Sequence, residues 1–268
     1  MTTRIDQRTF NLMAEAHKLW LQDRKRGRQL DVSYCDLTGL DLSDQNLREA
    51  KMEGTILFRV NLKRTNLSMS YMKNADLTGA FMFRTVMRGA ILDYAIFKGA
   101  AAKHSDFSYS TMNHCDFSHA IFGKNTLNGI RVRTATFYNA DLSRNHFIKS
   151  CFENCDLRKA NLEWSVLHKV VIKNCDLRGA NLDATDFQAA KLITSNFRGA
   201  SMVESCFERA ELYKVAMDEP VNTWPISSND NVIHYMTLSM TNLFLSPKKK
   251  RKSATKKGSE KKKNPIKA

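Results

Sequence analysis

The strongest constraint on this chain is a period of five residues. From Leu37 to Met217 every fifth residue is apolar, and these 37 positions hold only Leu, Phe, Met, Ile, Val and, once, Ala102. A fixed period sustained over such a length indicates a repeat architecture, in which each unit packs on the next. Because five matches neither the helical period of 3.6 nor the strand period of two, an ordinary helix or strand is excluded.

The residue two positions before each apolar centre indicates the geometry of the repeat. These positions run from 35 to 215, and Ala, Cys, Ser or Thr fills 29 of them. The exceptions are Leu40, Gln45, Val60, Asn125, Ile130, Asn145, Val170 and Val215. The centre and the small residue then face the same side, as on a short strand, and the two residues after each centre turn a corner. The sequence therefore predicts a polygonal coil, with successive coils stacked ~4.8 Å apart.

Glycine and cysteine spacings predict how many sides each coil has. Five glycines lie multiples of 20 residues apart, each two residues after a centre: Gly39, Gly79, Gly99, Gly179 and Gly199. Four cysteines in the small position have the same spacing: Cys35, Cys115, Cys155 and Cys175. Twenty residues make four sides of five. Because glycine is favoured where φ is positive, we expect one type of corner to recur every 20 residues.

Several segments fit the unit Ala-Asp/Asn-Leu-x-x closely. They are Ala75-Asp76-Leu77, Ala140-Asp141-Leu142, Ala160-Asn161-Leu162 and Ala180-Asn181-Leu182. Over about residues 31–217 the chain resembles the pentapeptide-repeat family. The resemblance implies an all-β solenoid, a right-handed quadrilateral β-helix of about nine coils and roughly 43 Å in length. The side chains expected to fill its core include Leu37, Leu77, Phe117, Leu142, Leu157, Leu177 and Phe197.

The segments outside the repeats are expected to cap the solenoid, since the ends of a repeat stack need covering. Residues 1–30 should form an N-terminal helical cap, with a helix over 6–26. Its shared face consists of Phe10, Met13, Ala14, Trp20 and Leu21. A helix that binds a membrane surface or a partner is the alternative. Residues 218–246 should form a C-terminal cap or a homodimer contact, because several members of the family dimerise through their C-terminal ends.

Net charge is concentrated at the ends of the chain. The whole sequence carries +15, of which residues 247–268 contribute +10 and residues 1–30 contribute +4. The Lys-rich tail has too few apolar residues to fold and is expected to be disordered. Its densest run is Lys248, Lys249, Lys250, Arg251 and Lys252. This run is typical of an arm that binds nucleic acid or of a nuclear-import signal, and a solvated tail without a specific role is the alternative.

The 20-residue period also brings basic residues together on the solenoid. A column we call the basic row holds one residue per coil: Arg64, Arg84, His104, Lys124 and Arg144. Lys63 and Lys103 are expected beside it, and Phe83 and Trp164 are nearby aromatic residues. Like charges ~4.8 Å apart repel, so the row is a candidate site for a polyanion such as a nucleic-acid backbone. A solvated surface is the alternative. A second column, Arg158, Arg178 and Arg198, has Asp156 and Asp176 close enough to pair with its first two members.

No group of residues suggests catalysis, a cofactor or a metal. The sequence lacks a glycine-rich phosphate loop, a Ser-His-Asp arrangement and a cysteine pair with zinc spacing. The six cysteines are expected to be free thiols, since Cys35 and Cys115 have no cysteine one coil away. With no secretory segment and no apolar run long enough to span a bilayer, the expected location is cytoplasmic, or nuclear if the protein is present in a eukaryotic cell.

Three functions are compatible with these features. The first is a non-catalytic scaffold that engages nucleic acid or a DNA-bound protein through the basic row and the basic ends. The second is a protein that interacts with DNA gyrase, a topoisomerase, as some members of the family do by resembling an acidic DNA duplex. The near-neutral body of this chain argues against simple mimicry of DNA. The third is a secreted effector that enters a eukaryotic host nucleus, with the tail as its import signal.

Overall fold

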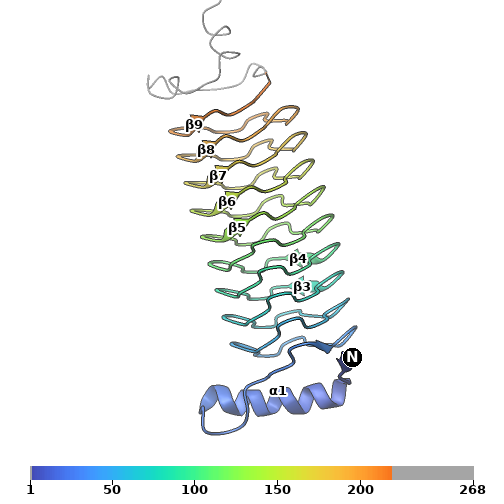
Figure 1. Cartoon of the computed structure of the whole chain (residues 1–268). Helices are drawn as coiled ribbons and strands as arrows, with labels where there is room; N and C mark the ends of the chain where they lie inside the picture. Colours follow the sequence, from blue (N-terminus) through green and yellow to red (C-terminus); the bar gives the residue numbers. More distant parts are fainter. Residues whose placement is uncertain (1, 219–268) are drawn as a thin grey trace, which may run out of the picture.

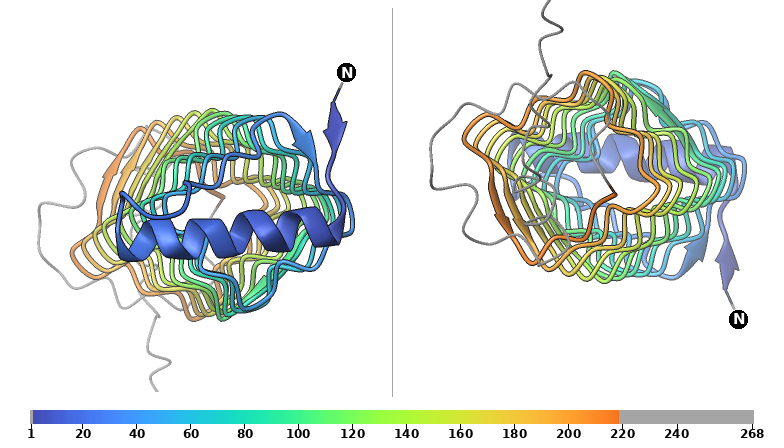
Figure 2. Two further views of the ribbon diagram at one scale, coloured as in Figure 1. Left: turned by 90° about the horizontal axis from the view of Figure 1, so that it is seen from below. Right: turned by 90° about the horizontal axis from the view of Figure 1, so that it is seen from above.

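The chain folds into a rod of stacked four-sided coils with a helix across its N-terminal end (Figures 1 and 2). The computed structural model describes residues 2–218. The segment expected to cap or dimerise and the Lys-rich tail lie outside the described residues, apart from Asp218. Parallel bridges join residues 20 positions apart, and one column of bridges runs without a break from Asp36 through Asp76 and Asp116 to Ala216. The predicted fold class, a quadrilateral β-helix, is confirmed.

The longer strands lie where three consecutive residues of a side, rather than one, pair with the next coil. After β1 (Thr3–Arg4) and β2 (Cys35–Asp36), which pair with each other, the strands are β3 (Phe81–Phe83), β4 (Ala101–Lys103), β5 (Arg131–Arg133), β6 (Cys151–Glu153), β7 (Val171–Lys173), β8 (Lys191–Ile193) and β9 (Glu211–Tyr213). β3 pairs with β4, and β5 to β9 form a five-stranded parallel sheet on another side of the rod. From β3 onward, paired residues are 20 positions apart, for example Val132 with Phe152.

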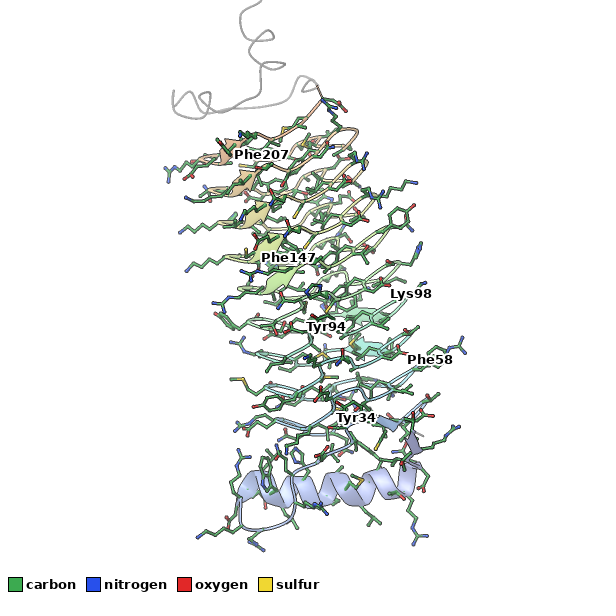
Figure 3. The ribbon with its side chains drawn as sticks, in the orientation of Figure 1. Tyr34, Phe58, Tyr94, Lys98, Phe147 and Phe207 are labelled. Carbon is green, nitrogen blue, oxygen red and sulfur yellow. The ribbon has the colours of Figure 1, made fainter. Side chains whose placement is uncertain are left out.

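The core is a column of apolar centres along the rod axis. The seven core residues named from the sequence are each at most 2 % exposed. Aromatic rings from successive coils stack face to face, as between Phe97 and Phe117, whose centroids are 4.6 Å apart with an interplanar angle of 3°. Outward residues such as Tyr34 and Tyr94 stand on the surface (Figure 3). Because each layer packs only against its neighbours, stability is close to a sum of nearest-neighbour contributions.

The prediction that glycine marks one type of corner was wrong. Every fifth residue from Tyr34 to Lys214 has a positive φ, and most of these residues are not glycine. All four corners therefore need a left-handed residue. Glycine is required for another reason at some of them: a Cβ on Gly54 would lie 2.5 Å from the ring of Tyr34, and one on Gly129 would lie 2.9 Å from the ring of Tyr109. At these corners the side chain of the preceding coil lies across the glycine.

The N-terminal helix α1 (Gln7–Gln22) covers the first coil (Figure 2). Asp6 caps it by accepting a hydrogen bond from the Thr9 N–H at 2.9 Å, which satisfies one of the free donors at a helix start. The helix ends four residues earlier than expected, because Asp23 takes an extended conformation. The side-chain amide of Gln7 pairs with the backbone of Asp41, donating to its carbonyl oxygen and accepting from its N–H, both at 2.9 Å.

The predicted apolar face of α1 omitted its most buried polar residue. Phe10 and Ala14 are buried as expected, but His17 is also fully buried. Its Nδ1 accepts a hydrogen bond from the Leu30 N–H at 3.0 Å, so its Nε2 carries the proton and donates to the carbonyl oxygen of Arg48 at 3.0 Å. Burial lowers the pKa of His17. The neutral imidazole thus joins α1 to the backbone at Leu30, just before the first coil, and at Arg48, near the end of that coil.

Acidification is expected to loosen this cap. Because the pKa of His17 is lowered in the folded state, its contribution to stability is complete above the ordinary value of 6.5 and is lost as the pH falls through the lowered pKa. Protonation removes the acceptor of the buried Leu30 N–H, which costs about 1–3 kcal/mol. Hydrogen-exchange protection of the α1 amides should therefore be complete at a pH above 6.5 and lower at an acidic pH below the lowered pKa of His17. In His17→Gln this pH dependence should disappear, and a wild-type helix equally protected at both pH values would contradict the assignment.

Ala102 is the one centre that is too small to fill its layer, and the structure shows how the space is used. Phe122 lies one coil above it, since Ala101 pairs with Ile121. The ring of Phe122 packs against Phe97 and Phe107, which flank Ala102 in its own coil, with centroids 5.7 and 5.3 Å away. The phenylalanine of the next coil therefore fills the layer that the alanine leaves open.

Ala102→Leu is accordingly expected to overpack the core and to lower the free energy of unfolding by about 1–3 kcal/mol. Urea denaturation followed by circular dichroism would measure the loss. Met82→Leu, a volume-conserving change one coil below, should cost less than about 1.5 kcal/mol. Adding Phe122→Leu to Ala102→Leu should restore part of the stability. An Ala102→Leu protein as stable as the wild type would show that the layer has unfilled space.

Candidate nucleic-acid interface

The basic row lies on successive coils at one corner of the rod. Each of its residues has a positive φ, between 56° and 62° from Arg64 to Arg144. The backbones of neighbouring coils are hydrogen-bonded at this corner: the Arg84 N–H donates to the Lys103 carbonyl at 3.0 Å, and the His104 N–H donates to the Lys124 carbonyl at 3.1 Å. All five side chains of the row are exposed. The structure thus brings together the residues that the 20-residue period placed in one column.

The side chains of the basic row differ in whether an acidic residue neutralises them. Arg64 forms a two-pronged ion pair with Asp44, which lies one coil below it, and this guanidinium holds the pKa of the Asp44 carboxyl below its ordinary value. Arg84 lies over the ring of Phe83, 5.3 Å from its centroid. Within residues 2–218, Lys103, Lys124 and Arg144 have no ion-pair partner. The unneutralised part of the row therefore runs from Arg84 to Arg144, and Lys63 lies half-buried at its lower end.

A groove of about 430 Å³ runs beside the unneutralised part of the row. Its lining residues come from four successive coils and are Phe81, Phe83, Ala101, Ala102, Lys103, Ile121, Gly123, Lys124, Asp141, Ser143 and Arg144. Phe81 is 49 % exposed and Ile121 is 58 % exposed. The carboxylate of Asp141 already accepts hydrogen bonds from the Ser143 N–H at 3.0 Å and the Asn161 amide at 3.3 Å. The groove therefore combines an apolar floor with a cationic edge.

The corners beneath this part of the row are built differently from the regular ones. At a regular corner the N–H three residues after the centre donates to the carbonyl of that centre, as from Thr65 to Leu62 at 3.1 Å. In the next four coils this N–H donates instead to a side-chain oxygen one coil above. The pairs are Thr85 to Ser105 Oγ, Ser105 to Asn125 Oδ1, Asn125 to Asn145 Oδ1 and Asn145 to Ser165 Oγ, at 2.7–3.2 Å. We call these four the open corners.

Two buried asparagines complete the open corners from inside the rod. Asn125 is 1 % exposed, and its amide donates to the carbonyl oxygen of Ala102 at 3.0 Å. Asn145 is fully buried, and its amide donates to the carbonyl oxygens of Phe122 and Leu142. The side chain of Asn125 therefore bonds to the coil below, and that of Asn145 bonds both to the coil below and to its own corner. Sequence reasoning recorded these asparagines only as exceptions to the small position. The signal that could have revealed their role is the polar column at intervals of 20 residues, from Thr65 to Ser205.

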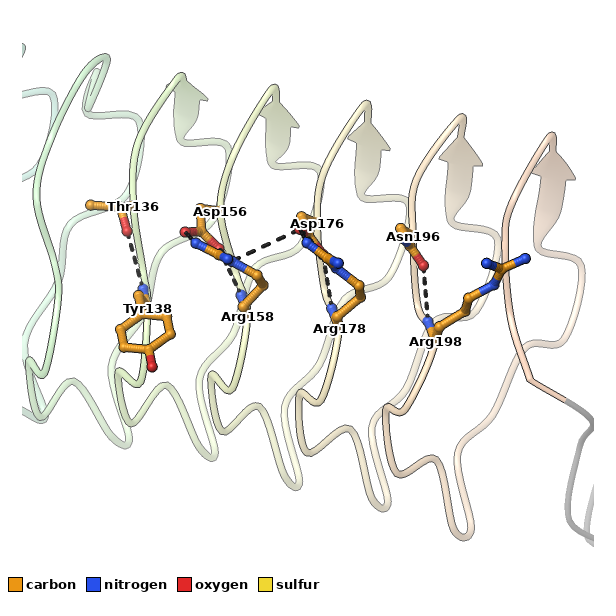
Figure 4. A network of polar contacts seen from close by, with 8 residues as sticks. All are labelled: Thr136, Tyr138, Asp156, Arg158, Asp176, Arg178, Asn196 and Arg198. Carbon is orange, nitrogen blue, oxygen red and sulfur yellow. Dashed lines mark hydrogen bonds and ion pairs between the residues drawn. The ribbon is translucent and has the colours of Figure 1, made fainter.

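The second basic column is largely neutralised, as its spacing predicted (Figure 4). The Arg158 Nη2 lies 2.7 Å from Asp156 Oδ2, and the Arg178 Nη2 lies 2.6 Å from Asp176 Oδ2. Each guanidinium lowers the pKa of its carboxyl partner. At Arg198 the acidic partner is replaced by Asn196, which accepts only the Arg198 backbone N–H, at 3.1 Å. This column therefore offers less free charge than the basic row.

Residues 2–218 also bear on metal binding and membrane insertion. That part of the chain holds no group of three or more His, Cys, Asp and Glu residues placed to bind a metal ion. None of its helices has the length and apolar character needed to cross a membrane. The six cysteines are free thiols, and burial raises the pKa of Cys115 to about 12. A buried thiol with a raised pKa is a poor nucleophile at neutral pH.

The role of Asn125 can be tested by removing its amide. Asn125→Leu keeps the approximate side-chain volume but leaves the buried Ser105 N–H and Ala102 carbonyl unpaired, at about 1–3 kcal/mol for each group. The free energy of unfolding from urea denaturation should fall by about 2–6 kcal/mol. Thr65→Val, in the same interior column but at a regular corner, leaves its backbone N–H paired and should cost less. Equal losses in the two variants would contradict the special role of the open corners.

Comparison with known proteins identifies the repeat. A family profile described as "Pentapeptide repeats (8 copies)" matches residues 31–64, 55–93, 70–108, 87–123, 127–163, 152–183 and 180–215. A comparison with the curated proteins finds no match.

Similar solved structures include HetL, a pentapeptide repeat protein involved in heterocyst differentiation regulation in Nostoc sp. strain PCC 7120. It is 18 % identical, with a TM-score of 0.49 over 76 % of this chain and 96 % of that one. QnrB1, a plasmid-mediated fluoroquinolone resistance protein, is 19 % identical, with a TM-score of 0.43 over 69 % of this chain and 91 % of that one. Rfr23 from Cyanothece 51142 is 16 % identical, with a TM-score of 0.35 over 40 % of this chain and 91 % of that one.

Proposed function

Because the chain belongs to the pentapeptide-repeat family, we propose that it is a non-catalytic scaffold that binds nucleic acid, free or as part of a nucleoprotein complex, through the basic row. The observation that carries this proposal is the run of unpaired cations at Lys103, Lys124 and Arg144, held one coil apart beside a groove. In the second basic column, by contrast, Arg158 and Arg178 are paired with acids. Cations that the fold leaves without counter-charges are suited to a polyanionic partner.

The charge balance of the rod supports an anionic partner over mimicry of one. Residues 31–217 contain 24 Lys and Arg residues against 20 Asp and Glu residues. A surface that imitated the phosphates of a DNA duplex would need a strong excess of acid, since the duplex carries one charge per ~1.7 Å of its axis. Gyrase binding by that route is therefore disfavoured for this chain. The run Lys248–Lys252, outside the described residues, would add affinity that depends on salt but not on sequence.

Reversing the row's charges should weaken binding and its salt dependence. The test variant is Lys103→Glu/Lys124→Glu/Arg144→Glu in the full chain. Fluorescence anisotropy with a labelled oligonucleotide should show lower affinity, and the slope of log K against log salt should fall by about two to three. The same variant is also made with residues 248–252 changed to Gln, so that the tail cannot conceal the effect.

The matched control is Lys51→Glu/Lys149→Glu/Lys169→Glu. It changes the net charge equally but lies on other columns of the rod, where all three side chains are exposed. It should retain most of the affinity. If both triple variants bind equally weakly, binding responds to net charge alone and the basic row is not the site. If no oligonucleotide binds the wild-type chain in a salt-dependent manner, the proposed function is wrong.

A further inference from the structure

We propose that the groove beside the basic row binds single-stranded nucleic acid, with bases stacked on Phe81 and Trp164 and phosphates on the cations between these rings. The proposal rests on the proposed function and adds the class of nucleic acid. Its basis is the order of side chains along one corner. Phe81 and Phe83 lie in the lowest coil, the unpaired cations Lys103, Lys124 and Arg144 lie in the next three coils, and Trp164 lies above them.

The geometry of the cations favours one strand over two. From Arg84 to Arg144 the unneutralised residues form a single file, one per coil, over about 14 Å at ~4.8 Å per coil. A stacked strand has one phosphate per ~3.4 Å, so this length matches about four phosphates. A duplex presents two phosphate chains across a groove. In the coils above the groove, the other edge of the same side of the rod carries Arg158 and Arg178. These two residues are paired with Asp156 and Asp176.

The aromatic side chains supply what a single strand needs and a duplex does not. Phe81 is 49 % exposed, and Trp164, one coil above Arg144, is 54 % exposed. The indole Nε1 of Trp164 donates to Glu163 Oε1 at 3.0 Å, which restricts the orientation of the ring. Unpaired bases stack on such rings, with about 1–3 kcal/mol for each base. The bases of a duplex are already stacked on one another and cannot use an aromatic ring on the protein surface.

Both ends of the row are closed by acidic residues, which limits the length of strand that can bind. Below, Asp44 neutralises Arg64. Above, the same corner carries Glu163, Asp183 and Glu204 in the coils from Trp164 onward. A phosphate chain that extended past either end would meet negative charge. The bound segment is therefore confined to the coils between Phe81 and Trp164, alongside the apolar side chains of Ala101 and Ile121.

The experiment compares one labelled DNA strand with the duplex formed from the same sequence, using the full chain with residues 248–252 changed to Gln. The single strand should bind at least about tenfold more tightly than the duplex. Phe81→Ala and Trp164→Ala should each weaken single-strand binding by at least about fivefold. Neither should change the affinity for the duplex. Both side chains face outward, and thermal melts followed by circular dichroism would confirm that the variants fold.

Tyr94→Ala is the matched control, because Tyr94 is an exposed aromatic, 48 % accessible, on the diagonally opposite corner. It should bind the single strand as the wild type does. Equal affinity for strand and duplex, or full binding by both aromatic variants, would overturn the assignment to single strands. In either case, loss of affinity in the triple charge reversal would leave the proposed function standing. If the charge reversal also has no effect, both proposals fail.

Discussion

The whole structure depends on the backbone hydrogen bonds that join each coil to the next. Every side of the rod repeats a parallel bridge between residues 20 positions apart, so no side can shift without breaking the register of the others. This constraint is strong enough to hold residues such as Thr134 and Thr194 at positive φ. A β-branched residue in that conformation is strained, and each such corner costs about 1–2 kcal/mol. The bonds between coils offset a strain that an isolated turn could not retain.

The same register converts sequence spacing into surface position. Residues 20 positions apart lie in one column, so similar side chains at this spacing form a continuous feature on the surface. The chain uses this property in opposite ways at two corners. In the second basic column Arg158 and Arg178 are balanced by Asp156 and Asp176 two residues earlier, which favours stability. In the basic row no acidic residue forms an ion pair with Arg84, Lys124 or Arg144 in the part of the chain that the structure describes, and repulsion is retained.

The period of five predicted the coils, the corners and the core because every coil repeats the same geometry. It predicted the row of Arg84, His104, Lys124 and Arg144 for the same reason. Features that occur once were not predicted. The pairing of Arg64 with Asp44 was missed although the two are 20 residues apart. The pairing of β1 with β2 and the bonds of His17 depend on where the N-terminal segment packs, which no repeat encodes. The glycine pattern misled because every corner has a positive φ, and residues such as Asn139 and Lys159 occupy the same column as Gly179.

The open corners connect the buried and exposed parts of the candidate site. A regular corner ends in a backbone bond that any sequence can make, whereas an open corner must be completed from inside by a side chain such as Asn125 or Asn145. Buried polar networks of this kind are stable only when every member is satisfied. The open corners lie under Arg84, His104, Lys124 and Arg144, and the groove lies beside them. The buried asparagines therefore do not contact a ligand, but they hold the backbone on which the cations and the apolar floor are arranged.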